Sequence, residues 1–407
     1  MRILRFSRVL STSQLYAKDW VRMVHMQVPF YRHSLSLENA QSVAKVLETP
    51  FLTSGPIGKE VEAQLCEYFG AKHAKLVNSW TNGAVATLLA MDIGPGDEVI
   101  VPTMTFIATA NVVELVGAKP VFIDCDPDTL FVTPELIKAA ITKNTKAVMP
   151  VHIYGQMCDV RAIKEILPKD QKIFIIEDCA HTFEAKFKGE RPGTYSDVAI
   201  FSFYATKNVA CGEGGAIITN DANLYERLQQ SILHGMSAGA ADRFSTGQYK
   251  HWGMEHLGTK ANLPDLLACL LPEQIKTIDK RLGIREEISQ RYESALMNTK
   301  IRVPKVLNDR VHSRHLFPIY VGAESRDKAL VALGEANIGA TVNYRSVHTM
   351  GFYSNKYGFS GNEFPYSLSW GNGTLSIPLF PGITTQEQEY VIDILVNKVD
   401  KMIGENK

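Results

Sequence analysis

Short apolar runs separated by helical patterns constrain the fold of this chain more than any other feature. Between about residue 73 and residue 220, strand-like runs alternate with segments of helical periodicity. This alternation is typical of repeated β-α units around a mainly parallel sheet. Seven runs are the candidate strands of one large sheet: AKLVN (74–78), DEVIVP (97–102), KPVFID (119–124), KAVMPV (146–151), KIFIIED (172–178), DVAIFSF (197–203) and GGAIIT (214–219).

The rest of the chain predicts a second, smaller unit. Residues 222–294 are helical in pattern, with a glycine- and polar-rich interruption at 235–260. A chain of 407 residues is long enough for two cores. We therefore predict an α/β architecture, with a large domain at 27–283 that includes an N-terminal arm and a small α+β domain at 284–407. The candidate elements of the small domain are a strand-like RHLFPIYV (314–321), a helix near 326–337, the segment IGATVNY (338–344) and a closing helix at 385–403.

Composition limits the partners of the protein. Lys plus Arg and Asp plus Glu number 43 each, without a long run of one sign, so no binding to nucleic acid is expected. No apolar stretch reaches about 18 residues, so no membrane span is expected. The six cysteines lack CxxC pairs, which predicts a reducing, cytoplasmic setting and no metal site. They are Cys66, Cys125, Cys158, Cys179, Cys211 and Cys269.

The first 26 residues read as an extension of uncertain status. Basic residues outnumber the single Asp19, and several Ser and Thr lie between them, as in a mitochondrial transit peptide. The alternative is an upstream start codon, with Met23 or Met26 as the true beginning. We favour this second interpretation, because sequence of folded character begins near Gln27.

The first candidate site is the turn Asn78–Gly83, between the strand AKLVN and a helix. Ligands of open α/β sheets bind beyond the carboxyl ends of the strands, which is where this turn lies. Backbone N–H groups at the helix start, the helix dipole and the Thr81 hydroxyl suit a phosphate. The alternative is that Ser79 and Thr81 act only as helix caps.

The second candidate is Glu177-Asp178, at the end of the run KIFII. A carboxylate at the edge of a buried strand is costly without a partner, and a protonated pyridine nitrogen would be such a partner. The alternative is a carboxylate that caps the next turn. His181 follows three residues later, either as a packed histidine or as one that contacts a bound ring.

The third candidate is Lys207, in the segment Ser202–Asn208 between two core strands. A lysine in this setting either extends its amine to water or serves as a reactive amine with a lowered pKa. The glycines at 212–215 allow a tight turn close to a bound group. Together the three sites offer the handles that pyridoxal phosphate needs, for its phosphate, its ring nitrogen and its aldehyde carbon.

The chain from Val28 onward resembles the DegT-type sugar aminotransferases, which are fold-type-I pyridoxal-phosphate enzymes with a three-layer large domain. Two further pieces, at 131–152 and 343–353, are most similar to the members that make UDP-4-amino-4-deoxy-L-arabinose. The most specific motifs are SGPIGKEVE (54–62), IGPGDEVIVPTMTFIATANVV (93–113), IIEDCAHTFEA (175–185), FSFYATKNVACGEGGAIIT (201–219) and TLSIPLFPGIT (374–384).

The resemblance implies roles for individual residues. Lys207 would bind the cofactor as a Schiff base and carry protons between cofactor and substrate. Asp178 would keep the pyridinium nitrogen protonated, and Phe106 would stack on the ring. The remaining cofactor contacts implied are Trp80, Thr81, His181, Ser202 and, from the neighbouring subunit of a homodimer, Asn262.

Two positions depart from the family pattern. Trp80 replaces the usual Gly or Ala of the phosphate turn, so its side chain must point away from the phosphate or reshape the site. Tyr204 replaces a common histidine. The candidates for contacts with the sugar, its diphosphate or the amino donor are Tyr204, Arg243, Tyr344, Arg345 and His348.

The implied reaction is transamination in two halves, with L-glutamate as donor and a nucleotide-linked 4-keto sugar as acceptor. Its product would be an amino sugar for lipopolysaccharide, O-antigen or other surface polysaccharide. Amination at C3 and a GDP-linked (perosamine-type) substrate stay open. Sugar dehydration by relatives with histidine in place of the lysine is disfavoured by Lys207. A non-catalytic relative should have lost one of the three handles, and none is lost here.

Overall fold

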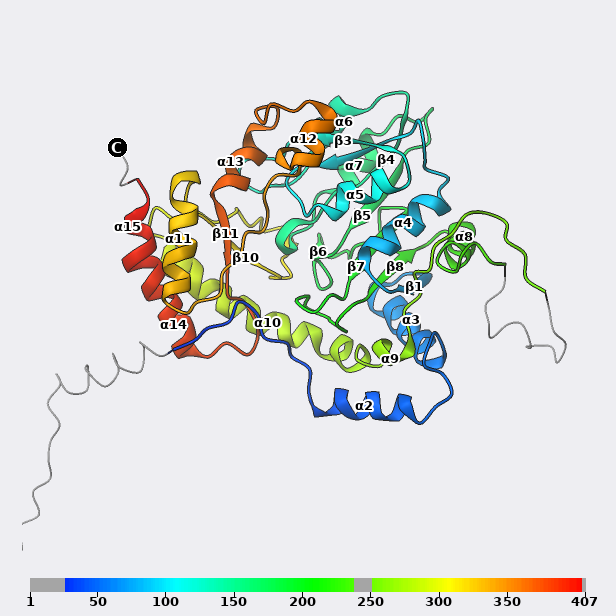
Figure 1. Cartoon of the computed structure of the whole chain (residues 1–407), viewed down its shortest axis with the longest axis horizontal. Coiled ribbons are helices and arrows are strands. Elements are labelled where there is room, and N and C mark those ends of the chain that lie inside the picture. The colour runs from blue at the N-terminus through cyan, green and yellow to red at the C-terminus, as the bar shows by residue number, and fades with distance from the viewer. Residues whose placement is uncertain (1–25, 238–250, 405–407) are drawn as a thin grey trace, which may run out of the picture.

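A seven-stranded sheet organises the larger part of the molecule (Figure 1). The computed structural model describes residues 26–237 and 251–404. The strand order is β1-β8-β7-β5-β4-β2-β3, and only β8 runs antiparallel to its neighbours. All seven predicted strands and the mainly parallel sheet are confirmed. The strands are β1 (His73–Val77), β2 (Glu98–Pro102), β3 (Lys119–Ile123), β4 (Thr145–Val148), β5 (Phe174–Asp178), β7 (Val198–Ser202) and β8 (Gly215–Thr219).

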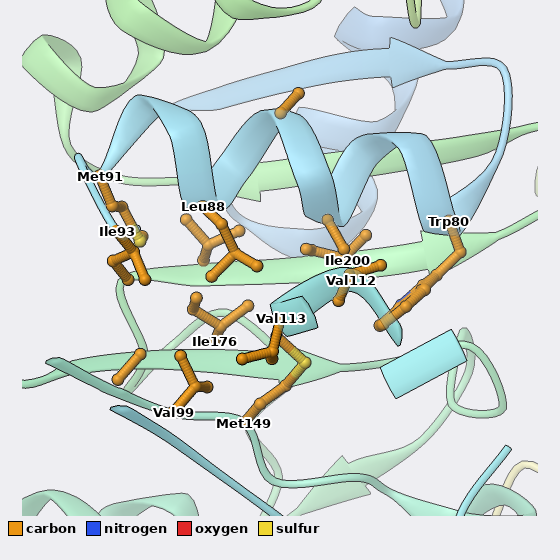
Figure 2. Close-up of a cluster of buried hydrophobic side chains, with 14 of the residues drawn as sticks. Trp80, Leu88, Met91, Ile93, Val99, Val112, Val113, Met149, Ile176 and Ile200 are labelled. Carbon is orange, nitrogen blue, oxygen red and sulfur yellow. The ribbon is translucent and has the colours of Figure 1, made fainter. Parts of the chain in front are cut away.

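Helices cover both faces of the sheet, as the alternation of side chains along β7 shows. Val198 and Ile200 point into one apolar cluster with α4, α5 and α8, whereas Ala199 and Phe201 point into another with α3. Figure 2 shows the first cluster beneath α4. Among the described residues no helix is long and apolar enough to span a membrane. The helices of this part are α2 (Leu37–Leu47), α3 (Pro56–Phe69), α4 (Trp80–Ala90), α5 (Ala108–Leu115), α6 (Pro134–Ala140), α7 (Val160–Ile166) and α8 (Ala222–Ser231).

The C-terminal part forms its own apolar cluster around a two-stranded antiparallel sheet, β10 (Phe317–Tyr320) and β11 (Thr374–Ile377). The predicted strand and both predicted helices are present. The segment 338–344 forms isolated bridges rather than a strand. The helices that pack here are α11 (Ala323–Glu335), α14 (Thr385–Ile394) and α15 (Asp400–Met402), the last two joined by a π-helical turn (Leu395–Val399).

One long helix, α10 (Pro272–Leu296), belongs to both parts of the molecule. Its first half contributes Ile275 and Ile278 to the cluster on the α3 face of the sheet, and its second half contributes Ile288 and Tyr292 to the C-terminal cluster. It follows the short α9 (Asp265–Ala268) and passes through the boundary predicted at 283/284 without a break.

Two segments pack in the part of the molecule that is distant from them in the sequence. Val28, in the N-terminal arm, packs in the C-terminal cluster and bridges Ile338. Tyr353, in α12 (Gly351–Tyr357), packs in the sheet cluster against Phe122 of β3. Figure 1 shows α12 and α13 (Pro365–Gly373) beside the β3 and α6 end of the large part. The division at 283/284 therefore stays a prediction.

Candidate active site

The predicted phosphate turn is the start of α4. Ser79 caps the helix, with its Oγ accepting the N–H of Asn82 at 3.0 Å. The N–H groups of Trp80 and Thr81 belong to the first helical turn, so they have no acceptor within the helix. A Cβ at Gly215 of β8 would lie 3.0 Å from the backbone nitrogen of Trp80, so glycine is required for this close approach. Capping and anion binding are thus compatible at this turn.

The Trp80 side chain points into the core rather than along the turn. Figure 2 shows it at the end of α4, directed toward the sheet beside Val112 and Ile200. Only 6% of Trp80 is exposed, and it belongs to the apolar cluster of that face. The bulky residue is accommodated by the core, and the backbone amides of the turn stay accessible to an anion.

Asp178 ends β5, and its carboxylate has hydrogen-bond donors but no ion pair with any cation among the described residues. Its Oδ2 accepts the Thr109 hydroxyl at 2.9 Å and its Oδ1 accepts the N–H of Ala180 at 3.1 Å. Burial raises the pKa of Asp178, although these hydrogen bonds and the charge of Lys207 act against the rise. Asp178 therefore caps the next turn and also offers a charge that a cationic ring nitrogen would complement.

Lys207 lies in the loop between β7 and β8. Burial lowers the pKa of its amine to about 8, with the nearby charge of Asp178 acting in the opposite direction. The Nζ atom lies 3.4 Å from Nε2 of His315. A lysine with a depressed pKa has an appreciable fraction of free amine near neutral pH, which is the form that attacks an aldehyde.

His181, Tyr344 and Phe106 form an aromatic wall beside these groups. Nδ1 of His181 accepts the N–H of Tyr154 at 3.0 Å, so Nε2 carries the proton and donates to the Tyr344 hydroxyl, 3.0 Å away. Burial also lowers the pKa of His181, which favours this neutral ring. The rings of Phe106 and Tyr344 lie 5.7 Å apart, and Phe106 is 54% exposed, which leaves its face available for stacking.

One cavity of about 570 Å³ joins all of these groups. A volume of this size suits a cofactor with a small substrate. The fit to pyridoxal phosphate depends on three features of the lining: free N–H groups for a phosphate, a buried carboxylate without a cation for the ring nitrogen, and an amine of lowered pKa for the aldehyde. The predicted residues that line the cavity are Trp80, Thr81, Phe106, Asp178, His181, Ser202, Tyr204, Lys207 and Tyr344.

The other predicted residues lie elsewhere. The side chain of Asn262 donates to Ser54 Oγ at 2.7 Å, outside the cavity of its own chain. Arg345 is exposed and does not line the cavity. His348 is fully buried, with its ring nitrogens 2.7 Å from Thr103 Oγ1 and 3.2 Å from the carbonyl oxygen of Gly361. Arg243 lies outside the described residues.

Sequence reasoning missed two residues of the site. Thr109, the donor to Asp178, lies three residues after Phe106 and belongs to the same motif, 93–113, which could have indicated it. His315, the neighbour of Lys207, is the second residue of the strand-like run RHLFPIYV. It is 108 residues from Lys207 in the chain, so no spacing in the sequence links the two.

Comparisons with known proteins agree with this geometry. The model of the DegT/DnrJ/EryC1/StrS aminotransferase family matches residues 34–396. The spore coat polysaccharide biosynthesis protein SpsC of Bacillus subtilis is 38% identical over an alignment of 380 residues, and the match covers 91% of this chain and 97% of SpsC.

Two solved structures extend the likeness to the fold. Spr1654 of Streptococcus pneumoniae, described as a sugar aminotransferase and solved in its PMP form, is 27% identical with a TM-score of 0.87, and the match covers 92% of this chain and all of that one. DesV of S. venezuelae is 31% identical with a TM-score of 0.83, over 92% of this chain and 99% of DesV. The chain belongs to the DegT/DnrJ/EryC1/StrS family and is a pyridoxal-phosphate-dependent sugar aminotransferase.

Proposed function

We propose that this enzyme transfers an amino group from L-glutamate to a nucleotide-linked 4-keto sugar, and that Lys207 is its catalytic lysine. The observation that carries the assignment of Lys207 is its place in the cavity between Asp178 and the turn at Ser79–Thr81. Pyridoxal phosphate, when bound, supplies an electron sink that stabilises a carbanion at the substrate carbon. The protein supplies the groups that bind, orient and move protons.

Each end of the site has a distinct task in this proposal. The free N–H groups of Trp80 and Thr81, with Ser202, hold the phosphate. The Asp178 carboxylate keeps the ring nitrogen protonated, and Phe106 and His181 contact the ring. The Lys207 Nζ takes a proton from the substrate carbon and returns it to the cofactor carbon, as a general base and then a general acid. A pKa of about 8 suits both steps near neutral pH.

The substrate side of the cavity supports a sugar. Tyr204 and Tyr344 line it, and Tyr204 is 47% exposed, so a polar hydroxyl and an aromatic face are both available to a ligand. The relative SpsC is named for polysaccharide biosynthesis, which supports an amino-deoxy sugar for surface polysaccharide as the product. Arg345 and His348 stay predictions as sugar or diphosphate contacts, and Arg243 stays a prediction as a contact of the donor.

A homodimer with shared active sites is part of the proposal. Asn262 is only partly buried and lies outside the cavity of its own chain. The proposal is that it reaches the phosphate in the site of a second copy, as the family resemblance implies. Analytical ultracentrifugation, combined with a mixture of Lys207→Ala and Asn262→Ala chains, tests this: shared sites predict that mixing restores about a quarter of the activity, when the chains re-assort at random.

The experiment that tests the substrate is a half-reaction screen. The enzyme in its pyridoxamine form is mixed with UDP-, dTDP- and GDP-linked 4-keto and 3-keto sugars, and the return of the visible absorbance of the pyridoxal form is followed. We expect a fast response to a UDP- or dTDP-linked 4-keto sugar. A response confined to 3-keto or GDP-linked sugars would replace the proposed substrate with one of the alternatives.

The experiment that tests the lysine is separate. The purified protein should be yellow, and the visible absorbance should be lost in Lys207→Ala while the variant keeps its fold by circular dichroism. An unchanged spectrum would contradict the assignment of Lys207.

A further inference from the structure

A buried imidazole faces the amine of Lys207. His315, just before β10, is 6% exposed, and its Nε2 lies 3.4 Å from the Nζ of Lys207. Both side chains also line a second, small cavity of about 30 Å³, which has room for one or two water molecules. The role of His315 depends on whether its Nε2 donates a hydrogen bond to the Lys207 amine or accepts one from it.

The Asn208 amide fixes the tautomer of His315. Its Nδ2 donates to the Glu184 carboxylate, at 3.2 and 3.0 Å from the two oxygens, and to the carbonyl oxygen of Ser313 at 3.0 Å. With the nitrogen committed to acceptors, Oδ1 is the atom that faces His315 Nδ1, at 3.2 Å. An oxygen can only accept, so Nδ1 carries the proton and Nε2 presents a lone pair to Lys207.

A buried ion pair holds this arrangement in place. Glu184 is paired with Arg285 of α10, and both side chains are almost fully buried. Arg285 Nε also donates to the Ser313 carbonyl at 3.2 Å, so the same carbonyl anchors Arg285 and Asn208. Burial and the charge of Lys207 lower the pKa of His315 well below its ordinary value, so the ring stays neutral and does not compete for the proton of the amine.

We propose that the Nε2 lone pair of His315 holds the amine of Lys207 whenever this lysine is not bonded to the cofactor. His315 is then a positioning residue: it accepts a hydrogen bond from the amine in both its charged and neutral forms and keeps it within reach of the reacting carbons. The inference rests on the proposed role of Lys207. The contacts of Asn208 with Glu184 act through His315, because they keep its lone pair on Nε2.

The test measures the titration of Lys207 in the full-length chain freed of cofactor. Trace acetic anhydride labels amines in proportion to their unprotonated fraction, and mass spectrometry of the Lys207 peptide at a series of pH values gives its pKa. The variants are His315→Phe, which removes the acceptor, and His315→Gln, whose side-chain oxygen can replace Nε2. The matched control is His312→Gln, because His312 lies on the same segment and its Nδ1 accepts the N–H of Arg314 instead.

The expected result separates the variants. Loss of an acceptor to a charged donor lowers the pKa of Lys207 by about one pH unit in His315→Phe, from about 8 in the wild type, so labelling at pH 7 rises about fivefold. His315→Gln and His312→Gln stay close to the wild type. Equal pKa values in wild type and His315→Phe, or a His315→Gln variant that behaves like His315→Phe, would overturn the proposal.

A second variant covers the case in which His315→Phe does not fold. Asn208→Ala removes the oxygen that fixes the tautomer, so the proton can move to Nε2 and the pKa of Lys207 should again fall. An unchanged pKa in this folded variant would also count against the proposal. The labelling result is independent of the spectrum of Lys207→Ala, so a failure of the catalytic assignment is seen separately.

Discussion

Two adjacent carboxylates at the end of β5 differ in how completely the protein satisfies them. Glu177 receives the Nε2–H of His152 at 2.7 Å, the N–H of Gly193 at 2.8 Å and the Ser196 hydroxyl. The His152 tautomer follows from its Nδ1, which accepts the N–H of Cys158 at 3.0 Å. Asp178, on the opposite side of the strand, has two donors within the part of the chain that the structure describes, and it faces the cavity.

The difference separates a structural carboxylate from a functional one. Glu177 and His152 lie with Cys179 in a group of possible metal ligands, but the oxygens of Glu177 and both nitrogens of His152 are already engaged by the protein. The Asp178 carboxylate can still accept a cationic partner from a ligand in the cavity. Both carboxylates are buried, so they differ in how fully the protein supplies their hydrogen-bond donors.

The largest expected effect is on catalysis, in Asp178→Asn. Without the charge the ring nitrogen of the cofactor loses its proton, and kcat should fall about a thousandfold. The unfolding free energy of the cofactor-free chain should change by less than about 1 kcal/mol, because the removed charge forms no ion pair with the described residues. Steady-state kinetics measure the fall in kcat, and urea unfolding measures the change in unfolding free energy. A loss of stability as large as that of Glu177→Gln would contradict the distinction between a functional Asp178 and a structural Glu177.

Glu177→Gln should show the reverse pattern. Its amide would place a donor against the proton of His152, so one charge-assisted hydrogen bond is lost and a buried N–H is left unpaired. The unfolding free energy should fall by about 4 kcal/mol. Cofactor affinity of the folded fraction, measured by absorbance titration, should stay within about threefold of wild type. A selective loss of cofactor binding would place Glu177 in the site.

The buried amine of Lys207 should also make the unfolding free energy depend on pH. The pKa of Lys207 is about 8 in the folded chain and near 10.5 when exposed, so the unfolded chain binds more protons between these values and stability rises with pH there. The cofactor-free wild type should be less stable than Lys207→Met by about 2 kcal/mol at pH 7.5, after allowance for water in the cavity, and the gap should close by pH 10.5. Denaturant unfolding at both pH values measures it. A gap that is independent of pH would mean that Lys207 is not desolvated.

The smallest effect is expected for Thr109→Val, which removes one of the two donors to Asp178. The pKa of Asp178 should rise further, and kcat/KM should fall about tenfold. Thr109→Ser is the matched control, because it keeps the hydroxyl. If serine and valine variants lose the same activity, the packing of the Thr109 methyl group matters rather than its hydrogen bond.

Most of the residues predicted to contact the cofactor line one cavity, whereas fewer of those predicted to contact the substrate do, for a physical reason. Asp178, Lys207 and the turn at Ser79–Thr81 follow strands whose apolar runs are readable, and parallel strands bring their ends to one edge. His315 and Thr341 reach the same place through long-range packing of segments without periodicity. No local pattern encodes such contacts.

Burial separates residues that residue type alone does not. The sequence offers His348 and Tyr344 equally as contacts of the substrate, and the structure places His348 in the core, bonded to Thr103, and Tyr344 in the lining of the cavity. The alternation of apolar runs with helical patterns predicted every strand of the large sheet, but not that Tyr353 would return from the C-terminal part to pack on β3.

The passage of α10 through both apolar clusters has a consequence for how the chain melts. A helix whose two halves are stabilised by different cores cannot fray at its centre without exposing side chains such as Ile278 and Ile288 on either side. Loss of one core removes the support of the shared helix and weakens the other. We therefore expect the sheet and the C-terminal cluster to unfold together, with α10 as the element that couples the two.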